Sequence, residues 1–304
     1  MTATSSGTLS TFQPPPPSPE ALNTPRPSDT PGPLKEVCGS TGSYIILAIL
    51  TDVTSPDTNA DGAIGFRIVQ VNFSGERIMV YGLPPELILS AANLQAYGLT
   101  DSTLSNAYNT VYNVERSNAD AVSLAANADA RMINENLGIL ASHYMVIDLA
   151  AIEKYVNKMG SLDVKLGGTF LSDEFDMQRG WQKLDGSLVR KYMTTKSKDG
   201  LGEWDRILRQ NDIVNSFRTL AINQDPAIFI SGFISLAEDG FASDLKTDQL
   251  SQLMCLTNSI EPVRFRFYSM PQSRVAAKED GTLTVTDMAS LRANIANTLG
   301  GTGE

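Results

Sequence analysis

Two arginines and a glutamine form the strongest candidate for a polar site in this sequence. Arg206, Arg209 and Gln210 follow one another at offsets of three and one, so in a helix they share one face. Two guanidinium groups and an amide on one face suit phosphate or pyrophosphate oxygens, which arginine binds with paired hydrogen bonds. Asp205, four residues before Arg209, and Asp212, three after it, also fit ordinary salt bridges on a solvated face. The spacing leaves both interpretations open.

Asp52 is a second candidate because it comes at the end of the most apolar segment, Tyr44–Leu50. Such a segment predicts a buried strand, and ligands collect at the carboxyl ends of sheet strands. A carboxylate at that position suits Mg²⁺ bound against a pyrophosphate. Asp52 also opens the segment 54–57, rich in turn residues, so a plain turn residue is the alternative.

Other catalytic patterns are absent from the sequence. His143 is the single histidine, and the two cysteines do not complete a zinc-binding spacing. There is no Gly-x-Ser-x-Gly elbow, no P-loop and no Gly-x-Gly-x-x-Gly. His143 directly precedes the apolar segment Tyr144–Ile147, which favours a structural histidine bonded to backbone over a catalytic one.

The two cysteines, Cys38 and Cys255, flank most of the chain that we expect to fold. An even count permits a disulfide without requiring it, and two buried free thiols explain the same count. Their separation in space decides between these readings, and sequence does not give it.

Charge and hydropathy exclude several classes of partner. The formal net charge is -10, whereas nucleic-acid-binding proteins carry a basic face, so we expect no nucleic-acid partner. The same charge disfavours broad docking on anionic lipid. The longest strongly apolar run, Tyr44–Leu50, is far shorter than the about 20 residues of a membrane-spanning helix. Any membrane attachment is therefore expected through an anchor that this chain does not contain.

The chain divides into a short leader and one long folded region. Residues 1–34 hold nine of the 15 prolines with many serines and threonines, which predicts a disordered, semi-extended linker. Residues 35–300 alternate between strand and helix patterns. We expect strands at 44–50, 66–72, 77–81, 144–147, 163–166 and 263–268, and helices at 118–137, 148–159, 203–222, 226–237, 247–259 and 287–299. This unsegregated order predicts an α/β fold with a central sheet covered on both faces.

Several short segments resemble motifs of the LytR-CpsA-Psr family and occur in that family's order. They cover residues 44–222 and are Ile45–Asp52, Ile68–Asn72 with Arg77–Leu83, Leu104–Tyr108, Asn136–Ile139 with His143-Tyr144 and Asp148, Met159–Val164, and Leu184–Gly186 with Tyr192, Arg206, Arg209 and Gln210. Each segment is weak alone, and their shared order makes the resemblance specific.

The resemblance implies a three-layer α-β-α sandwich with a central mixed sheet, on the outer side of the cytoplasmic membrane. It implies an isoprenoid tail in an apolar tunnel and transfer of a glycopolymer from polyprenyl pyrophosphate to a cell-wall acceptor. Arg206, Arg209 and Gln210 would then bind phosphate, and Asp52 would hold Mg²⁺. Asp52, Arg206 and Arg209 are thus the predicted catalytic residues.

Three departures from the family pattern remove arginines. The family's Arg-x-Asp is replaced within Asn59–Gly65, where Asp61 is the remaining candidate metal ligand. The Pro-Arg-Asp motif reads Pro84–Glu86, and Tyr-x-Arg-x-Arg reads Tyr192–Lys196, which leaves Lys196 as a point charge for phosphate. Each lost charge-assisted hydrogen bond is worth about 1.5–3 kcal/mol, so the sequence predicts a weakened site.

Three functions follow as competing hypotheses. The first is a divergent phosphotransferase, and the second is a non-catalytic protein that binds polyprenyl phosphate with the same fold. The third is an envelope scaffold whose pocket has closed. A retained apolar groove would support the first two, and its collapse would exclude both.

Overall fold

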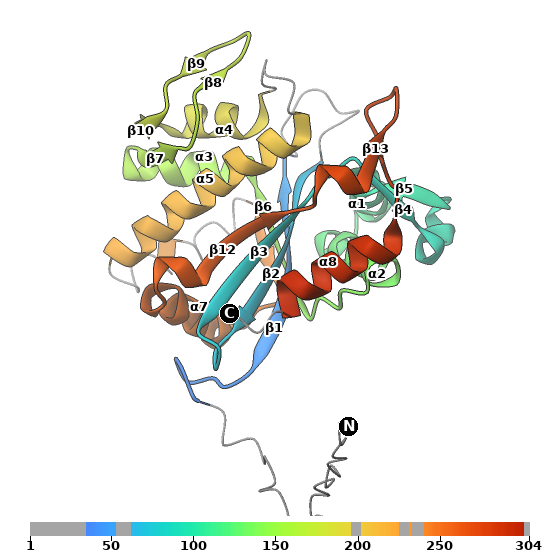
Figure 1. Cartoon of the computed structure of the whole chain (residues 1–304), viewed down its shortest axis with the longest axis horizontal. Coiled ribbons are helices and arrows are strands. Elements are labelled where there is room, and N and C mark those ends of the chain that lie inside the picture. The colour runs from blue at the N-terminus through green and yellow to red at the C-terminus, as the bar shows by residue number, and fades with distance from the viewer. Residues whose placement is uncertain (1–34, 53–61, 196–201, 225–230, 233–239, 301–304) are drawn as a thin grey trace, which may run out of the picture. The chain divides into compact units, whose positions relative to one another are not determined.

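The computed structural model describes residues 35–52, 62–195, 202–224, 231–232 and 240–300. Its centre is a six-stranded mixed sheet (Figure 1). In spatial order the strands are β11 (Phe241–Ser243), β6 (His143–Asp148), β1 (Ser43–Thr51), β2 (Ala63–Asn72), β3 (Arg77–Leu83) and β12 (Phe265–Ser269). The pairs β1–β6 and β3–β12 are parallel, and the other neighbours are antiparallel. The carboxyl ends of β1, β3, β6 and β12 therefore meet at one edge of the sheet.

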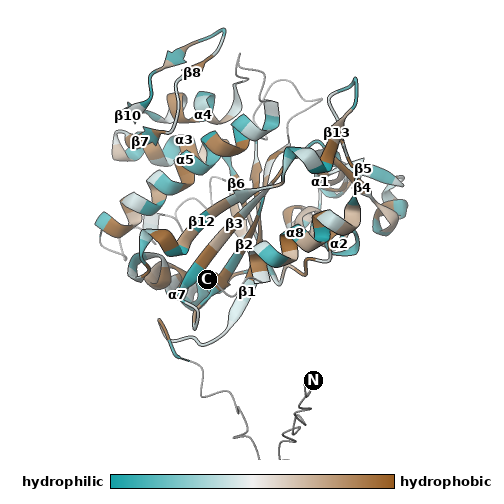
Figure 2. Cartoon of the chain, in the orientation of Figure 1, coloured by the Kyte–Doolittle hydropathy of each residue, from teal (hydrophilic) through white to brown (hydrophobic). Residues whose placement is uncertain are grey.

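Strand β1 is apolar on both sides because both faces of the sheet are covered. Leu47 and Ile49 pack into one core cluster, and Ile46 packs into another. This alternation follows from the two-residue period of a strand. It explains why the segment reads as a continuous apolar run rather than as an alternating one. Figure 2 shows the same concentration of hydrophobic residues in the central strands.

Helices cover both faces of the sheet, which confirms the predicted three-layer α-β-α sandwich. On one side lie α1 (Leu104–Glu115), α2 (Ala121–Leu137) and α8 (Met288–Gly300). On the other side lie α3 (Leu149–Met159), α4 (Gly186–Thr194), α5 (Gly202–Asn223) and α7 (Thr247–Ser259).

Short sheets and turns extend the two sides. One small sheet has the order β13 (Val275–Ala277), β14 (Leu283–Val285), β4 (Leu87–Ser90) and β5 (Asp101–Thr103). Two hairpin-like pairs are β7 (Leu162–Leu166) with β10 (Gly180–Leu184), and β8 (Phe170–Leu171) with β9 (Asp176–Met177). Single 3-10 turns are η2 (Ala92–Tyr97), η4 (Pro262–Arg264) and η5 (Gln272–Arg274).

Most predicted elements are present, with shifted ends. The predicted strand at 263–268 begins at Phe265, because the segment from Pro262 to Arg264 forms the turn η4. Helix α3 is capped as predicted by Asp148, whose Oδ1 accepts a hydrogen bond from Ala150 N at 2.8 Å. Helices α1 and α4 were not predicted. The predicted helix at 226–237 and the predicted linker at 1–34 lie almost wholly outside the described residues.

A disulfide joins Cys38 to Cys255, with 5.8 Å between their Cα atoms. It links the segment before β1 to helix α7, which are 217 residues apart in sequence. Within the described part of the chain, no helix has the length and hydropathy to cross a bilayer.

Helix α4 owes its start to Asp185, whose Oδ1 accepts a hydrogen bond from Leu188 N at 2.8 Å. Replacement of an N-cap aspartate by alanine typically costs about 1 kcal/mol. We therefore expect Asp185→Ala to lower the free energy of unfolding by that amount in urea titrations. Asp185→Asn keeps the acceptor oxygen and serves as the control, with stability close to that of the unsubstituted chain. Equal losses in the two variants would contradict the capping role.

Candidate functional site

An apolar cavity of about 310 Å³ lies between the sheet and helices α3, α5 and α7. Its floor is formed by side chains of β1, β2, β3 and β6, on the face of the sheet that is turned away from α1 and α2. Representative lining residues are Ala48, Val69, Val80, Met145, Phe217 and Leu253. Ligand pockets are commonly concave, mostly apolar and provided with few polar groups. The groove that the two ligand-binding hypotheses require is therefore open, which favours them over a scaffold with a closed pocket.

Arg67, on β2, is the most deeply buried charged group in the cavity wall, with 7% of its surface exposed. Its Nε donates to Asn211 Oδ1 at 3.2 Å, and Nη1 donates to the carbonyl of Phe66 at 2.9 Å. Nη2 donates to Gln210 Oε1 at 2.9 Å and to the carbonyl of Ile207 at 3.2 Å. Three of these four acceptors lie on helix α5, so Arg67 connects the sheet to that helix.

Two glycines make room for these contacts. A Cβ on Gly65 would lie 2.8 Å from Gln210 Oε1, and one on Gly82 would lie 2.8 Å from the Ile207 side chain. Both distances are shorter than side chains tolerate. The glycines of β2 and β3 therefore allow α5 to approach the sheet where Arg67 meets it.

The charge of Arg67 has no carboxylate partner among the residues that the structure describes. Burial, with a contribution from the nearby Arg206, lowers the pKa of the Arg67 guanidinium to about 10. The group therefore remains charged at neutral pH. An uncompensated buried cation is costly, which makes Arg67 unusual in an apolar wall.

The predicted phosphate-binding arginines of α5 have carboxylate partners. Arg206 Nη2 donates to Glu86 Oε1 at 2.8 Å and also pairs with Glu203. Arg209 Nε donates to Asp205 Oδ2 at 2.8 Å. These contacts match the salt-bridge interpretation of the sequence, and a phosphate-binding role for the two arginines stays a prediction.

The side chains of the predicted trio also point to different neighbours. Arg209 is only 3% exposed; it donates to the carbonyl of Tyr192 and lies over the Phe170 ring at 4.6 Å. Gln210 faces Arg67 and the cavity, and its Nε2 lies 3.4 Å from the carbonyl of Met193. Gln210 is thus the member of the trio that lines the cavity.

The buried Tyr192 and the partly buried Asp212 form a pair beside Arg209. The Tyr192 hydroxyl donates to Asp212 Oδ2 at 2.9 Å. Burial raises the pKa of both groups, with the Asp212 carboxylate adding to the effect on Tyr192. The tyrosine therefore stays protonated and acts as a donor in this arrangement.

Asp52 lies at the carboxyl end of β1, as predicted, and pairs with Arg190 of helix α4. The other amino group of Arg190 lies 3.4 Å from Glu153 Oε2 on α3. Next to this group, Thr51 Oγ1 donates to Asp148 Oδ2 at 3.0 Å. Asp52 and Glu153, which Arg190 bridges, therefore lie at this end of the sheet.

The metal prediction can be examined only for the residues that the structure describes. Among them, no group of three or more histidine, cysteine or acidic side chains is placed to hold a metal ion. The Asp52 carboxylate, moreover, is engaged by a guanidinium. Mg²⁺ is usually held by one or two protein carboxylates together with substrate phosphates, so the predicted metal site stays a prediction. Asp61 and Lys196, the other predicted ligands for metal and phosphate, lie outside the described residues.

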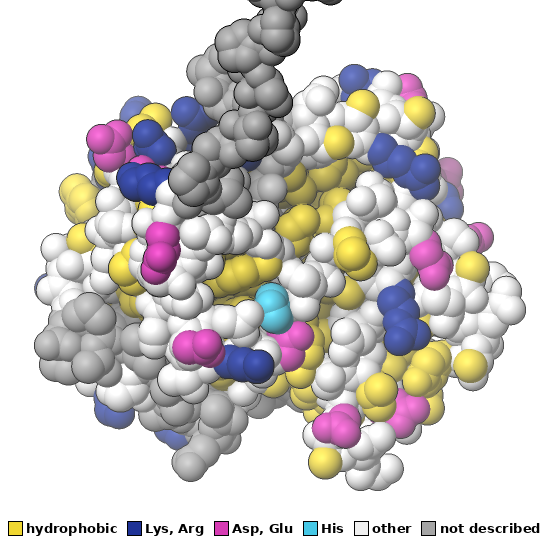
Figure 3. Space-filling model, turned by 90° about the horizontal axis from the view of Figure 1, so that it is seen from below, with side chains coloured by type: hydrophobic (Ala, Val, Ile, Leu, Met, Phe, Trp, Pro, Cys, Tyr) yellow, Lys and Arg dark blue, Asp and Glu magenta, His cyan; other side chains and the backbone are white. Residues whose placement is uncertain are grey.

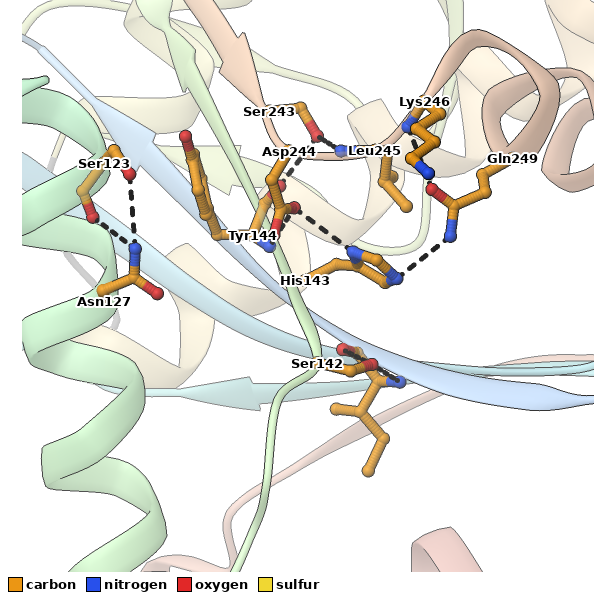
Figure 4. Close-up of polar contacts among 11 residues, drawn as sticks. Ser123, Asn127, Ser142, His143, Tyr144, Ser243, Asp244, Leu245, Lys246 and Gln249 are labelled. Atoms are coloured by element: carbon orange, nitrogen blue, oxygen red, sulfur yellow. Dashed lines mark hydrogen bonds and ion pairs between the residues drawn. The ribbon is translucent and has the colours of Figure 1, made fainter.

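His143 lies at the start of β6, at the opposite end of the strand from Asp148 (Figure 4). Its Nδ1 is 3.4 Å from Asp244 Oδ1, and its Nε2 is 3.1 Å from Gln249 Nε2. These partners are side chains, whereas the sequence led us to expect a backbone partner. Figure 3 shows the single histidine on the face seen from below, beside a hollow lined by hydrophobic side chains.

Sequence reasoning missed Arg67 and Arg190. The available signal for Arg67 was a lone basic residue within the apolar strand segment 66–71. Arg190 belongs to a helix that was not predicted, so its direction toward Asp52 had no signal in the sequence.

Comparisons with known proteins show which family this chain resembles. The model of the LytR_cpsA_psr family matches residues 91–297, which is more than half of the chain. A curated relative is a polyisoprenyl-teichoic acid--peptidoglycan teichoic acid transferase, TagU, from Enterococcus faecalis. It is 23% identical over 121 residues, which cover 40% of this chain and 40% of the relative. The match thus spans well under half of that protein's length.

Solved structures share the fold at low sequence identity. TagV of B. subtilis superposes with a TM-score of 0.63 and 15% identity over 87% of this chain and 100% of that one. A structure of TagT bound to LI-WTA gives a TM-score of 0.59 and 13% identity over 88% of this chain and 94% of that one. At such identity these structures establish the fold alone, and the match of the family model establishes membership. The chain belongs to the LytR_cpsA_psr family.

Proposed function

We propose that this protein is a cell-wall glycopolymer phosphotransferase that acts on polyprenyl-pyrophosphate-linked glycopolymer and delivers it to a cell-wall acceptor. The observation that carries the proposal is the open apolar cavity of about 310 Å³ beneath helix α5. Family membership and the name of the curated relative, a transferase for polyisoprenyl-linked teichoic acid, support the substrate class. We place the domain on the extracytoplasmic face of the membrane.

The cavity would hold the isoprenoid tail and fix the position of the pyrophosphate. Phosphoryl transfer then requires alignment of the reacting oxygens and stabilisation of negative charge, with little covalent work by the protein. Arg206, Arg209 and Gln210 remain the proposed contacts for the phosphates, with Lys196 as a further cation. Mg²⁺, with Asp52 and Asp61 as ligands, also stays a proposal; when bound, it would neutralise pyrophosphate charge.

A second candidate function is non-catalytic binding of polyprenyl phosphate. It is favoured by the carboxylates that already pair with Arg206 and Arg209. Each such partner competes with a phosphate for the same guanidinium group. A site with compensated arginines would stabilise the transition state poorly while the cavity still bound the lipid.

Filling the cavity tests the proposal by ligand binding. Ala48 lies on β1 in the cavity wall, and Ala48→Phe would place a ring in the space for the tail. We expect farnesyl pyrophosphate to bind the unsubstituted chain and to lose at least about tenfold in affinity in the variant, since steric exclusion removes apolar contact. Isothermal titration calorimetry measures both affinities.

Leu140→Phe is the control for this titration, because Leu140 is 71% exposed and does not line the cavity. It should bind the ligand as the unsubstituted chain does. Thermal unfolding of both variants shows whether they remain folded. Undiminished binding by folded Ala48→Phe would place the lipid elsewhere and remove the main support for the proposed function.

A further inference from the structure

The cations around the site differ in whether a carboxylate offsets their charge. Arg206 contacts two glutamates, Arg209 contacts an aspartate, and Arg190 lies between two acidic groups. Arg67 contacts only neutral oxygens within the described part of the chain. Among the described residues, Arg67 and Arg218 are therefore the cavity-lining cations that no carboxylate offsets, whereas Arg206 and Arg209 are compensated.

Neutral acceptors hold the Arg67 side chain in place without cancelling its charge. Four of the five N–H groups of a guanidinium are used by Asn211, Phe66, Ile207 and Gln210, as their distances of 2.9–3.2 Å show. One N–H on Nη1 is left for a ligand, and the group lines the cavity. The side chain is therefore fixed before a ligand arrives, which reduces the entropy cost of binding.

The position of Arg67 suits the anionic end of an amphiphile. In the sheet it pairs with Ala48 of β1 on one side and Gly82 of β3 on the other. Apolar wall residues such as Val69 and Val80 continue from there along the same face of the sheet. A molecule with its anion at Arg67 would thus extend its tail over apolar side chains.

A second arginine, Arg218, also lines the cavity but is placed differently. It follows Gln210 by eight residues on α5, or about 12 Å along a helix. It is only partly buried, donates to the carbonyl of Ile260 at 3.3 Å and lies over the Phe265 ring at 5.1 Å. Arg218 therefore marks the far part of the cavity and provides a matched comparison.

We propose that Arg67 binds the phosphate or pyrophosphate group of an isoprenoid lipid inside the cavity. The proposal rests on the proposed function, since it assigns a residue to the same ligand. It adds a guanidinium on β2 to the phosphate contacts proposed for Arg206, Arg209 and Gln210 on α5.

The test compares a charged and a neutral ligand with the same tail. Calorimetry measures the affinities of farnesyl pyrophosphate and farnesol. The proteins are the unsubstituted chain, Arg67→Gln, Arg67→Lys and Arg218→Gln. We expect Arg67→Gln to lose about tenfold to hundredfold in affinity for the pyrophosphate and to bind farnesol unchanged. Arg218→Gln should retain the preference for the pyrophosphate.

Other outcomes overturn the proposal in different ways. A preference that survives Arg67→Gln or disappears only in Arg218→Gln places the anion elsewhere. Equal loss of both ligands in Arg67→Gln assigns Arg67 to holding α5 alone. If Arg67→Gln does not fold, Arg67→Lys decides, because it keeps the charge: a retained preference supports the proposal, and its loss refutes it. Failure of the unsubstituted chain to bind either ligand refutes the proposed function itself.

Discussion

Removal of the disulfide by the double substitution Cys38→Ser and Cys255→Ser is expected to lower the free energy of unfolding by about 2–5 kcal/mol. The bridge closes a long loop, since its cysteines are 217 residues apart. A cross-link over such a separation restricts the unfolded chain strongly, and its loss restores that freedom. Urea titrations of the two proteins, both under non-reducing conditions, measure the difference.

Helix α7 is the element that loses its covalent attachment in this double variant. The bridge attaches α7 to the segment before β1, and Leu250 and Leu253 of α7 line the cavity. Treatment of the unsubstituted chain with dithiothreitol is the control and should reproduce the stability of the double variant. Equal stability of the oxidised chain and the variant would show that the bridge does not stabilise the fold.

Substitution of the buried Asp129 by asparagine is expected to stabilise the protein at pH 7 by about 1–3 kcal/mol. Asp129 lies on α2 with 0% of its surface exposed, and neither carboxylate oxygen has a hydrogen-bond partner among the described residues. Nearby, Asn93 donates from Nδ2 to the carbonyl of Ala128 at 3.1 Å, and its Oδ1 also lacks a partner there. An asparagine at position 129 removes the charge while keeping the size of the side chain.

The raised pKa of Asp129 determines how the stability of the protein changes with pH. Burial raises the pKa of Asp129 well above its ordinary value of 3.8. Between that value and the raised pKa, the folded chain holds a proton that the unfolded chain releases. Stability therefore falls as the pH rises through this window. Urea titrations from pH 4 to pH 8 should show the advantage of Asp129→Asn growing with pH. An advantage that is constant or shrinks with pH would contradict a buried, protonated Asp129.

The fold was largely predictable because strongly patterned segments make up its centre. The apolar run of β1, the cap of α3 at Asp148 and the stripe on α5 each follow from local rules that tertiary contacts reinforce. Helix α4 was missed although Asp185 and Gly186 mark its beginning, because its nine residues give a short pattern. Strands β5, β8, β9, β13 and β14 were missed because strands of two or three residues have no detectable period.

The site was less predictable because its contacts join residues that are distant in sequence. Glu86 pairs with Arg206 across 120 residues, and Asp52 pairs with Arg190 across 138. Helical spacing placed the α5 arginines on one face but gave no information on which carboxylates face them. Arg67 was overlooked because a strand residue points to one of two faces, and only the packed structure shows which of them lines the cavity.

Transfer of glycopolymer is the measurement that tests the central claim most directly. A labelled polyprenyl-pyrophosphate-linked glycopolymer is incubated with peptidoglycan and either the unsubstituted chain, Ala48→Phe or Arg206→Ala with Arg209→Ala, and covalently attached label is counted. We predict attachment by the unsubstituted chain and its loss in both variants. Binding of the donor by the unsubstituted chain without any attachment would contradict the transferase and leave non-catalytic binding of the lipid as the function.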